Sequence, residues 1–194
     1  MDYTTTTMVK ASLGISGSTL DALLARYVTE ASRTIDRHCS GMQNSDNYFE
    51  AATVTNEEVS GQVDMNGNIL CQARKAKVSS VSALSYRRSP LEDWISVNTD
   101  YVTIDGYNVM AWTGLGCRGK VFVKMSYAGG QATSVSGLPA DLSEATTILA
   151  IRLYEENKSG LGDVVGISEL GQVYYSKAMP QRVDLLLGPY RRVQ

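Results

Sequence analysis

The chain is poor in the residues that most often carry enzyme chemistry, with one histidine, His38, and three cysteines among its 194 residues. It has no C-x-x-C and no H-x-x-x-H pair. A structural zinc site, which takes about four cysteine or histidine ligands, is therefore not expected. The phosphate-cradling P-loop and the G-x-S-x-G turn of serine hydrolases are also missing. These absences leave no catalytic, metal-ligating or cofactor-binding residue to name.

Neither charge nor hydropathy directs the chain toward nucleic acid or a membrane. Its formal net charge is −2, too small to attract either partner to the whole molecule. No apolar run approaches the roughly 18 residues that cross a bilayer, and residues 1–7 do not have the pattern of a secretory signal. Cys39, Cys71 and Cys117 lie far apart and are odd in number. This favours free thiols in a reducing compartment over a disulfide framework.

Residues 114–119, GLGCRG, match the dinucleotide-binding fingerprint G-x-G-x-x-G. That fingerprint functions when a strand precedes it and a helix begins inside it, because the helix N-terminus then faces the pyrophosphate. Here apolar side chains occupy every second position from Val121 to Tyr127. Such alternation predicts a half-buried strand. We therefore expect a glycine-rich turn between two strands rather than a nucleotide site.

The two ends of the chain have the apolar spacing of amphipathic helices. A long helix is expected over 18–39, with Ser18 as its N-cap and Asp21 completing the cap. A shorter helix over 7–13 precedes it and is stopped by Gly14. The chain is therefore expected to open with two helices.

A second long helix is expected to begin at Pro139, because proline suits the first helical turn. Its main apolar face runs from Leu142 to Leu153, whereas Ile151 and Tyr154 lie off that face. Apolar residues at these two positions are explained by a second surface that binds a partner, and nearly as well by a thick core around the helix.

Residues 158–178 then form a long connection with four glycines. Connections of this length without regular structure are usually functional or disordered. A short helix is expected over 180–187, ended by Gly188–Pro189. We expect residues 190–194 to leave the core as a short basic tail.

The middle of the chain has the period of strands. Asn66–Gly67 and Asp105–Gly106 are strong hairpin turns, since both dipeptides tolerate a positive φ. Six short strands are expected, over residues 69–73, 78–86, 94–97, 101–104, 108–112 and 120–127.

The predicted fold class is α+β. Residues 1–45 and 135–194 are expected to form a discontinuous helical bundle core. Residues 46–134 are expected to form an inserted antiparallel β module, a small sandwich or an open barrel.

Three weaker signals stay open. A dyad of His38 and Cys39 is conceivable, but such a pair is more often a helix end with one satisfied ring. Acidic pairs at 57–58, 92–93 and 155–156 leave a two-carboxylate hydrolase conceivable but unsupported. Trp94, Trp112 and the tyrosines of the β module would stack sugars if they were exposed, although filling the core is the commoner role of strand aromatics.

A set of fragments, taken in order, carries a resemblance to a known family. Those in the helices and strands before the long connection are residues 9–15, 20–24, 31–36, 100–101, 121–130, 138–142 and 145. The most specific fragments lie in the ending, at 168–169, 171, 175–176, 179–180, 183, 186–187 and 189–192. Together they resemble the head–tail connector, or head-completion adaptor, proteins of long-tailed bacteriophages.

The resemblance implies a structural virion protein that is not an enzyme and has no cofactor. Such adaptors form a ring, commonly dodecameric, under the portal of a DNA-filled head, and they extend the DNA exit channel. The implied partners are the portal protein, a tail or stopper protein, further copies of the chain, and double-stranded DNA that passes without sequence-specific binding. The implied location is the head–tail interface of the virion, with the host cytoplasm during assembly and no membrane.

The β module is larger than in the shortest members of this family, so its role stays open. The alternatives are a small virion hydrolase and a carbohydrate-binding β module on a helical base. An exposed row of tryptophans and tyrosines would favour the carbohydrate-binding module.

Two contact surfaces are expected from this interpretation. Neighbouring subunits are expected to meet through the second long helix and the glycine-rich connection, at Ile151, Tyr154, Val164, Tyr174 and Tyr175. The portal contact is expected in the tail, at Tyr190, Arg191 and Arg192, because tyrosine and arginine are enriched at interface hot spots. A chain shortened after Gly188 is expected to keep its thermal midpoint.

Overall fold

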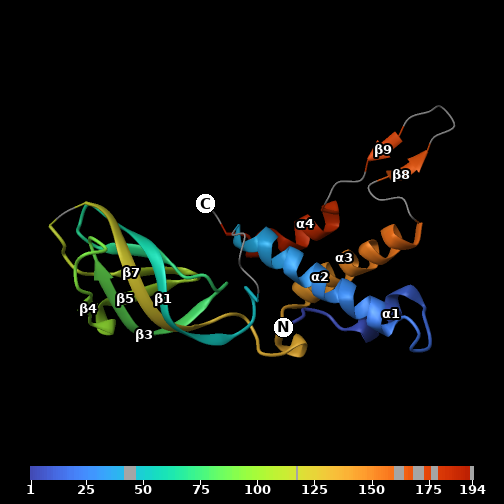
Figure 1. The fold of residues 1–194 in the computed structure, drawn as a ribbon, viewed down its shortest axis with the longest axis horizontal. Helices are drawn as coiled ribbons and strands as arrows, with labels where there is room; N and C mark the ends of the chain where they lie inside the picture. Colours follow the sequence, from blue (N-terminus) through green and yellow to red (C-terminus); the bar gives the residue numbers. More distant parts are fainter. Residues whose placement is uncertain (42–46, 117, 160–163, 168–172, 176–178, 193–194) are drawn as a thin grey trace. The chain divides into compact units, whose positions relative to one another are not determined.

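A computed structural model of the chain describes residues 1–41, 47–116, 118–159, 164–167, 173–175 and 179–192, with backbone only for 159, 164–167 and 173–175 (Figure 1). The fold is α+β. The chain divides into two compact units, which we call the helical unit, Met1–Asn47 with Ser134–Gln194, and the β module, Tyr48–Thr133.

The helical unit is built from both ends of the chain. Its α-helices are α1 (Thr6–Leu13), α2 (Asp21–Ser40), α3 (Ala140–Ser159) and α4 (Gln181–Leu187). Helix α3 packs against each of the other three. Their apolar stripes meet in one buried core, made by Val9, Leu24, Tyr27, Val28, Ala31, Ile35, Leu142, Ala145, Leu149, Ala150, Val183 and Leu187. Short 3₁₀ turns at Val135–Gly137 and Gly188–Tyr190 flank α3 and α4.

The ends of the first two helices follow the predicted signals with one exception. Gly14 and Gly41 end α1 and α2 in the left-handed conformation, at φ of 65° and 66°. The predicted N-cap of α2 is wrong: Leu20 occupies that position and makes no side-chain cap bond. The carboxylate of Asp21 instead accepts a bond from Nζ of Lys10 at 2.6 Å, because α1 lies close enough to supply a cation.

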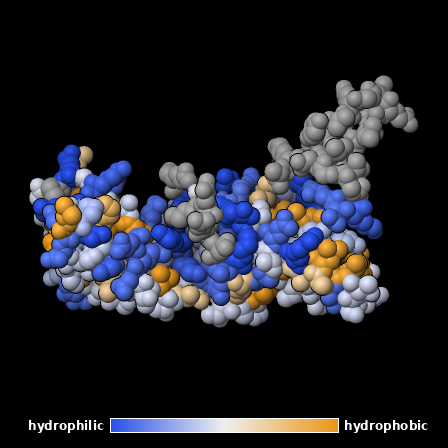
Figure 2. Space-filling model, in the orientation of Figure 1, coloured by the Kyte–Doolittle hydropathy of each residue, from blue (hydrophilic) through white to orange (hydrophobic). Residues whose placement is uncertain are grey.

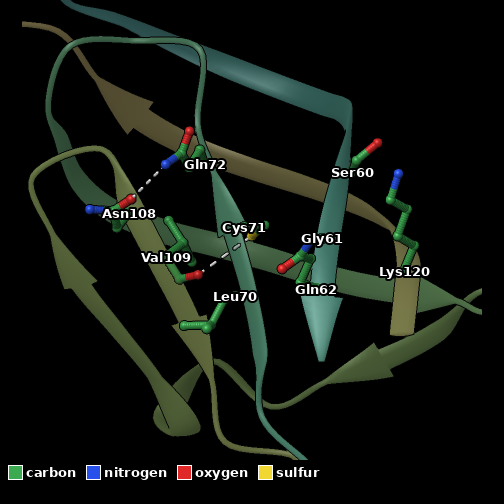
Figure 3. A pocket seen from close by; sticks show the side chains of 9 residues that line it. All are labelled: Ser60, Gly61, Gln62, Leu70, Cys71, Gln72, Asn108, Val109 and Lys120. Carbon is green, nitrogen blue, oxygen red and sulfur yellow. Dashed lines mark hydrogen bonds between the residues drawn. The ribbon is translucent and has the colours of Figure 1, made fainter. Parts of the chain in front are cut away.

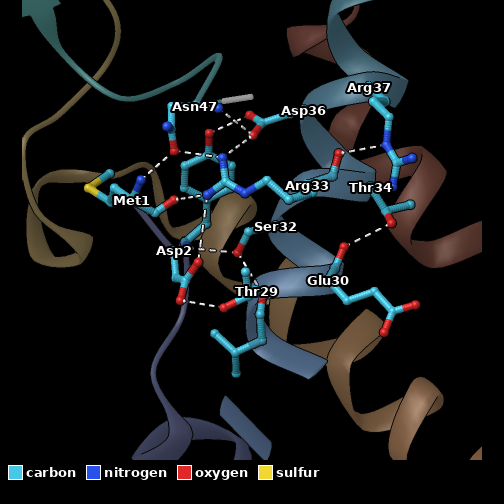
Figure 4. A network of polar contacts seen from close by, with 12 residues as sticks. Met1, Asp2, Thr29, Glu30, Ser32, Arg33, Thr34, Asp36, Arg37 and Asn47 are labelled. Carbon is cyan, nitrogen blue, oxygen red and sulfur yellow. Dashed lines mark hydrogen bonds and ion pairs between the residues drawn. The ribbon is translucent and has the colours of Figure 1, made fainter. Parts of the chain in front are cut away.

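A buried carboxylate fastens the first residues of the chain to α2 (Figure 4). The side chain of Asp36 is fully buried, and it accepts bonds from the hydroxyl of Tyr3, from Nη1 of Arg33 at 2.8 Å and from the backbone N–H of Asn47 at 2.8 Å. The backbone N–H of Tyr3 also donates to Oγ of Ser32 at 3.1 Å. A buried charge is tolerated when it is paired and hydrogen-bonded in this way.

The β module is a single antiparallel sheet in the order β4-β3-β7-β1-β2-β6-β5. Its strands are β1 (Ala52–Val63), β2 (Ile69–Gln72), β3 (Val78–Arg87), β4 (Ile95–Val97), β5 (Val102–Asp105), β6 (Asn108–Ala111) and β7 (Gly119–Gly129), with a 3₁₀ turn at Thr99–Tyr101. The sheet curls, and the N–H of Val78 at the start of β3 donates to the carbonyl of Gly106 in the β5–β6 turn at 2.8 Å. The module is therefore a half-open barrel and not a two-sheet sandwich.

One side of the curled sheet holds the apolar core of the module. Its buried members are Val63, Ile69, Cys71, Ala73, Val78, Leu84, Tyr86, Val109, Ala111, Val121, Val123, Met125 and Tyr127. They occupy alternate positions of their strands, which leaves the intervening side chains on the solvent-facing side.

The six predicted strands are confirmed as β2 to β7, but β1, the longest strand, was not predicted. Its alternation breaks at a bulge between Val54 and Glu57, where Asn56 has a φ of 53°. An extra residue in a bulge moves the following side chains to the opposite face, which hides the period of two in the sequence.

The hairpin turns at Asn66–Gly67 and Asp105–Gly106 are confirmed, with φ of 79° at Gly67 and 61° at Gly106. Residues 114–116 and 118 lie between the end of β6 at Ala111 and the start of β7 at Gly119, so the expected segment between two strands is confirmed for its described residues. In that segment the N–H of Leu115 donates to the carbonyl of Gly67 at 2.8 Å.

The long connection after α3 differs from its prediction. It contains the two-stranded antiparallel pair β8 (Val164–Ile167) and β9 (Val173–Tyr175), where no regular structure was expected. Valine, isoleucine and tyrosine at these positions favour extended backbone, and the glycines around them concealed that preference.

Candidate functional site

Helix α3 carries the predicted subunit interface in its second half. Residues Ile151 to Tyr154 are all half-buried, although four consecutive positions point in different directions around a helix. In the N-terminal half Leu142, Ala145 and Leu149 face the core, and the polar residues Ser143, Thr146 and Thr147 are buried as well. The apolar side chains of Ile151 and Tyr154 are thus partly open to solvent in the single chain. The side chains of Val164, Tyr174 and Tyr175 lie outside the described part of the structure.

The predicted tail does not leave the core. The N–H of Arg192 donates to the carbonyl of Cys39 at 2.8 Å, and only 9% of Arg192 is exposed. Arg191 is exposed, and its Nη1 lies 3.3 Å from Oδ1 of Asp184 on α4. Tyr190 is half-buried, and its burial, together with the nearby Asp141, raises the pKa of its phenol.

The expectation of a tail outside the core is therefore wrong through Arg192. Its cause is the 3₁₀ turn at Gly188–Tyr190, which extends α4 by one turn and directs the chain back toward the end of α2.

The conceivable dyad at the end of α2 does not have the geometry of a nucleophile and its base. Burial, with a contribution from Asp36, raises the pKa of the Cys39 thiol to about 12. The thiol is therefore protonated at neutral pH, and a protonated thiol is a poor nucleophile. The ring of His38 is engaged elsewhere, with Nε2 at 3.1 Å from Oδ1 of Asp184.

Within the acidic pair 57–58 the two carboxylates have separate partners. Glu57 accepts from the hydroxyl of Tyr127 at 2.9 Å, whereas Glu58 lies 3.9 Å from Nη2 of Arg87. Glu156 binds Nε of Arg152 at 2.5 Å. Among the described residues, no group of three histidine, cysteine or acidic side chains is arranged to hold a metal ion. No described helix combines the length and apolar character needed to cross a membrane.

The aromatic residues of the β module divide between two environments. The ring of Trp94 lies between the guanidinium of Arg87, at 4.4 Å, and Nζ of Lys124, at 4.6 Å. Trp112 and Tyr101 are 51% and 60% exposed, and the N–H of Trp112 donates to the carbonyl of Tyr101 at 2.9 Å. One adjacent aromatic pair is therefore on the surface.

A groove on the β module, with exposed polar side chains along a largely apolar lining, was not predicted. It has a volume of about 440 Å³ and is lined by side chains of four neighbouring strands (Figure 3). The exposed side chains in it are Ser60, Gln62, Leu70, Gln72, Asn108 and Lys120. Figure 2 shows that the surface of the β module mixes such polar side chains with scattered apolar ones. Each residue is unremarkable in the sequence, because only the strand register brings them together.

Solved structures share the fold of this chain, but comparison with known proteins identifies no family for it. No protein-family model matches the chain, and no curated protein matches it. Among solved structures, a chain in the neck of an empty gene transfer agent particle, computed with C6 symmetry, has a TM-score of 0.56 and 18% sequence identity. The match covers 97% of this chain and 89% of that one.

Two further chains match with lower scores. One is in the virion of a native gene transfer agent particle, with a TM-score of 0.48 and 19% identity over 93% of this chain and 81% of that one. The other is in the neck of a native particle computed with C12 symmetry, with a TM-score of 0.47 and 20% identity over 95% of this chain and 88% of that one. The match with a TM-score of 0.56 confirms the predicted resemblance to head–tail connectors at the level of the fold.

Proposed function

We propose that this chain is a structural virion protein that forms a ring between the head and the tail of a phage-like particle. The observation that carries the proposal is the fold, which the chain shares over 97% of its length with a chain from the neck of a gene transfer agent particle. Coverage of both units argues that the β module belongs to the shared architecture. In this role the chain works by shape and by contacts between proteins, without a cofactor.

The ring is held, in this proposal, by the second half of α3 together with the β8–β9 hairpin. Ile151 and Tyr154 supply apolar surface that the single chain leaves partly open. Burying such a side chain between subunits contributes about 1.5–3 kcal/mol at full burial. The hairpin is the next described element after α3 in the sequence, and in this proposal its residues Val164, Tyr174 and Tyr175 contribute to the same interface.

The portal contact is proposed for the end of α4 and the residues that follow it. Arg191 is exposed, and Tyr190 is partly exposed, so both are accessible to a partner. Arg192 is buried against the helical unit and holds this segment in place. The segment is therefore presented as an ordered surface, which lowers the entropic cost of binding.

The opposite end of the ring would carry the stopper or tail, and double-stranded DNA would pass through the centre. A net charge of −2 suits passage, since a surface that neutralised many phosphates would bind DNA tightly and oppose sliding.

The proposal is tested by measuring the mass of the purified chain by light scattering, alone and mixed with the portal protein of its particle. We expect a ring of uniform stoichiometry, commonly twelve copies for this family, at least in the presence of portal. Electron microscopy of the same sample should show an annular complex. A chain that stays monomeric and unbound with portal at tens of micromolar contradicts the proposal.

The interface is tested separately by changing Ile151→Asn and Tyr154→Asn together. The double variant should fold, because neither side chain is fully buried, but it should not form the ring. The matched control is Leu91→Asn, which removes an apolar side chain that is 97% exposed and lies in the β module. Rings from the α3 variant would place the interface elsewhere.

A further inference from the structure

The groove of the β module is built by the register of four strands. Gln62 of β1 lies opposite Leu70 of β2 on one side and Lys120 of β7 on the other. Gln72 of β2 lies opposite Asn108 of β6. These side chains therefore project from the same, solvent-facing side of the sheet. Because paired strands hold their spacing, the backbone positions from which these side chains project are fixed before any ligand arrives.

The hydrogen-bonding groups of the groove are of the kind that bind hydroxyls. Nε2 of Gln72 donates to Oδ1 of Asn108 at 3.2 Å (Figure 3). This bond leaves Oε1 of Gln72 as an acceptor and the amide nitrogen of Asn108 as a donor, and the two groups point away from each other (Figure 3). A ligand with several hydroxyls can therefore donate to one of them and accept from the other through separate hydroxyls.

Other polar groups in the groove are available to a ligand. The hydroxyl of Ser60, the amide of Gln62 and the amine of Lys120 make no side-chain bond within the described part of the chain. In water they are hydrated, and a ligand rich in hydroxyls replaces those waters without leaving a polar group unsatisfied.

The apolar contacts of the groove fit the carbon face of a sugar. Leu70, which is 42% exposed, lies within the lining. Phe122, which is 39% exposed, lies opposite Ser60 and two residues beyond Lys120 along β7, on the same side of the sheet. Phe122 lies outside the lining, and Cζ of Arg87 lies 5.6 Å from the centroid of its ring. A flat ligand with hydroxyls at its edge and C–H groups on its face would therefore contact the amides and Leu70.

The charge of the groove selects against other ligands. Lys120 is the one charged side chain in its lining, where Cys71 is a buried thiol whose pKa is raised to about 12, and no carboxylate or histidine is present there. A phosphate polymer needs several cations for affinity, and a metal site needs several carboxylate, imidazole or thiolate ligands. We propose that this groove binds a short neutral oligosaccharide. This site is independent of the ring, since it uses only residues of the β module.

The test is an NMR titration of the full chain with cellotriose, maltotriose and chitotriose in turn, each up to 20 mM, roughly the range in which weak sites saturate. We expect one of them to cause saturable shifts in the backbone and side-chain amide signals of Gln62, Gln72 and Asn108. Absence of saturable shifts with all three sugars, or shifts confined to other residues, overturns the proposal. Binding of the neutral peptide acetyl-AQAQA-amide instead of the sugars also overturns it.

Variants separate the groove from nonspecific effects. Gln72→Ala removes the acceptor and the bond to Asn108, and it should weaken sugar binding at least about tenfold. Lys120→Met keeps the aliphatic part of the side chain and removes the ammonium group. It is a second groove variant, and it should fold because Lys120 is exposed. Gln181→Ala is the matched control, since it removes an exposed amide of the same type from α4. Equal binding by the groove variants and the control contradicts the assignment.

Discussion

Nε2 of His38, at the end of α2, lies 3.1 Å from Oδ1 of Asp184 on α4, and the same carboxylate oxygen lies 3.3 Å from Nη1 of Arg191. The side chain of Asp184 thus contacts the end of α2, 146 positions away in the sequence, and also Arg191, which follows α4. The arrangement places the proposed portal-binding segment on the end of α2.

A double-mutant cycle with His38→Ala and Asp184→Ala measures this connection. Both side chains are partly exposed, so the coupling energy in chemical denaturation should be about 0.2–1 kcal/mol. When His38 is protonated, the coupling should fall as the salt concentration is raised, because dissolved ions screen the attraction between exposed charges. A coupling of zero at low salt would mean that the two side chains do not interact in solution.

Removal of the residues after Gly188 should lower the thermal midpoint, contrary to the expectation from sequence. The truncation removes the buried Arg192 and its backbone bond to Cys39. We expect a loss of about 1–3 kcal/mol, since one hydrogen bond and one buried side chain disappear. Differential scanning calorimetry compares this chain with one truncated after Arg192. Equal midpoints for both would contradict the packing described for this segment.

Two glycines in hairpin turns, both with a positive φ, should respond differently to Ala. At Gly106 an added Cβ meets open space, so Gly106→Ala should cost about 1–2 kcal/mol from the left-handed conformation alone. At Gly67 a Cβ would collide with the backbone of Gly114 and Leu115. Gly67→Ala should therefore cost about 1–3 kcal/mol more. Urea denaturation measures the loss of unfolding free energy in each variant. Equal losses for Gly67→Ala and Gly106→Ala would contradict the prediction.

Cys39 and Cys71 should resist alkylation while the chain is folded. Burial raises the pKa of both thiols to about 12, with added contributions from Asp36 and Glu57 respectively. At pH 8 only about one molecule in ten thousand then carries a thiolate at either position, and the thiolate is the reactive form. Mass spectrometry after iodoacetamide treatment should find both unmodified in buffer and modified in 6 M guanidinium, a concentration roughly sufficient to unfold most domains. Rapid labelling in buffer would show that these thiols are exposed in solution.

Asp64 should stabilise the β1–β2 turn in a pH-dependent way. Its carboxylate accepts bonds from the N–H groups of Asn66 and Asn68, each at 2.8 Å, and the bonds to Asn68 contribute most to a pKa lowered from 3.8. A lowered pKa in the folded state gives stability that is present above about pH 4 and is lost as the carboxylate becomes protonated. The thermal midpoint of Asp64→Ala should therefore lie below that of the parent at pH 7 and approach it at about pH 2. A constant difference at both pH values would assign the effect to shape rather than charge.

The sequence alone determined the local elements whose period is unbroken. Apolar residues three or four positions apart located the four described α-helices, and apolar residues at every second position located six strands. Both patterns depend only on residues close together in the sequence. The hairpin turns were equally accessible, since Asn66–Gly67 and Asp105–Gly106 have few alternatives that suit a positive φ. The ordered fragments also gave the resemblance that the fold confirms.

Tertiary structure decided the features that depend on residues distant in the sequence. The bulge at Val54–Glu57 is fixed by pairing with β7, and the return of Arg192 is fixed by the carbonyl of Cys39. The groove exists because strand register aligns Gln62 with Leu70 and Lys120, and Gln72 with Asn108. A shift of one residue in any of these pairings would turn the amides to the opposite face. Register is set by the packing of the whole sheet, which no local pattern of residues specifies.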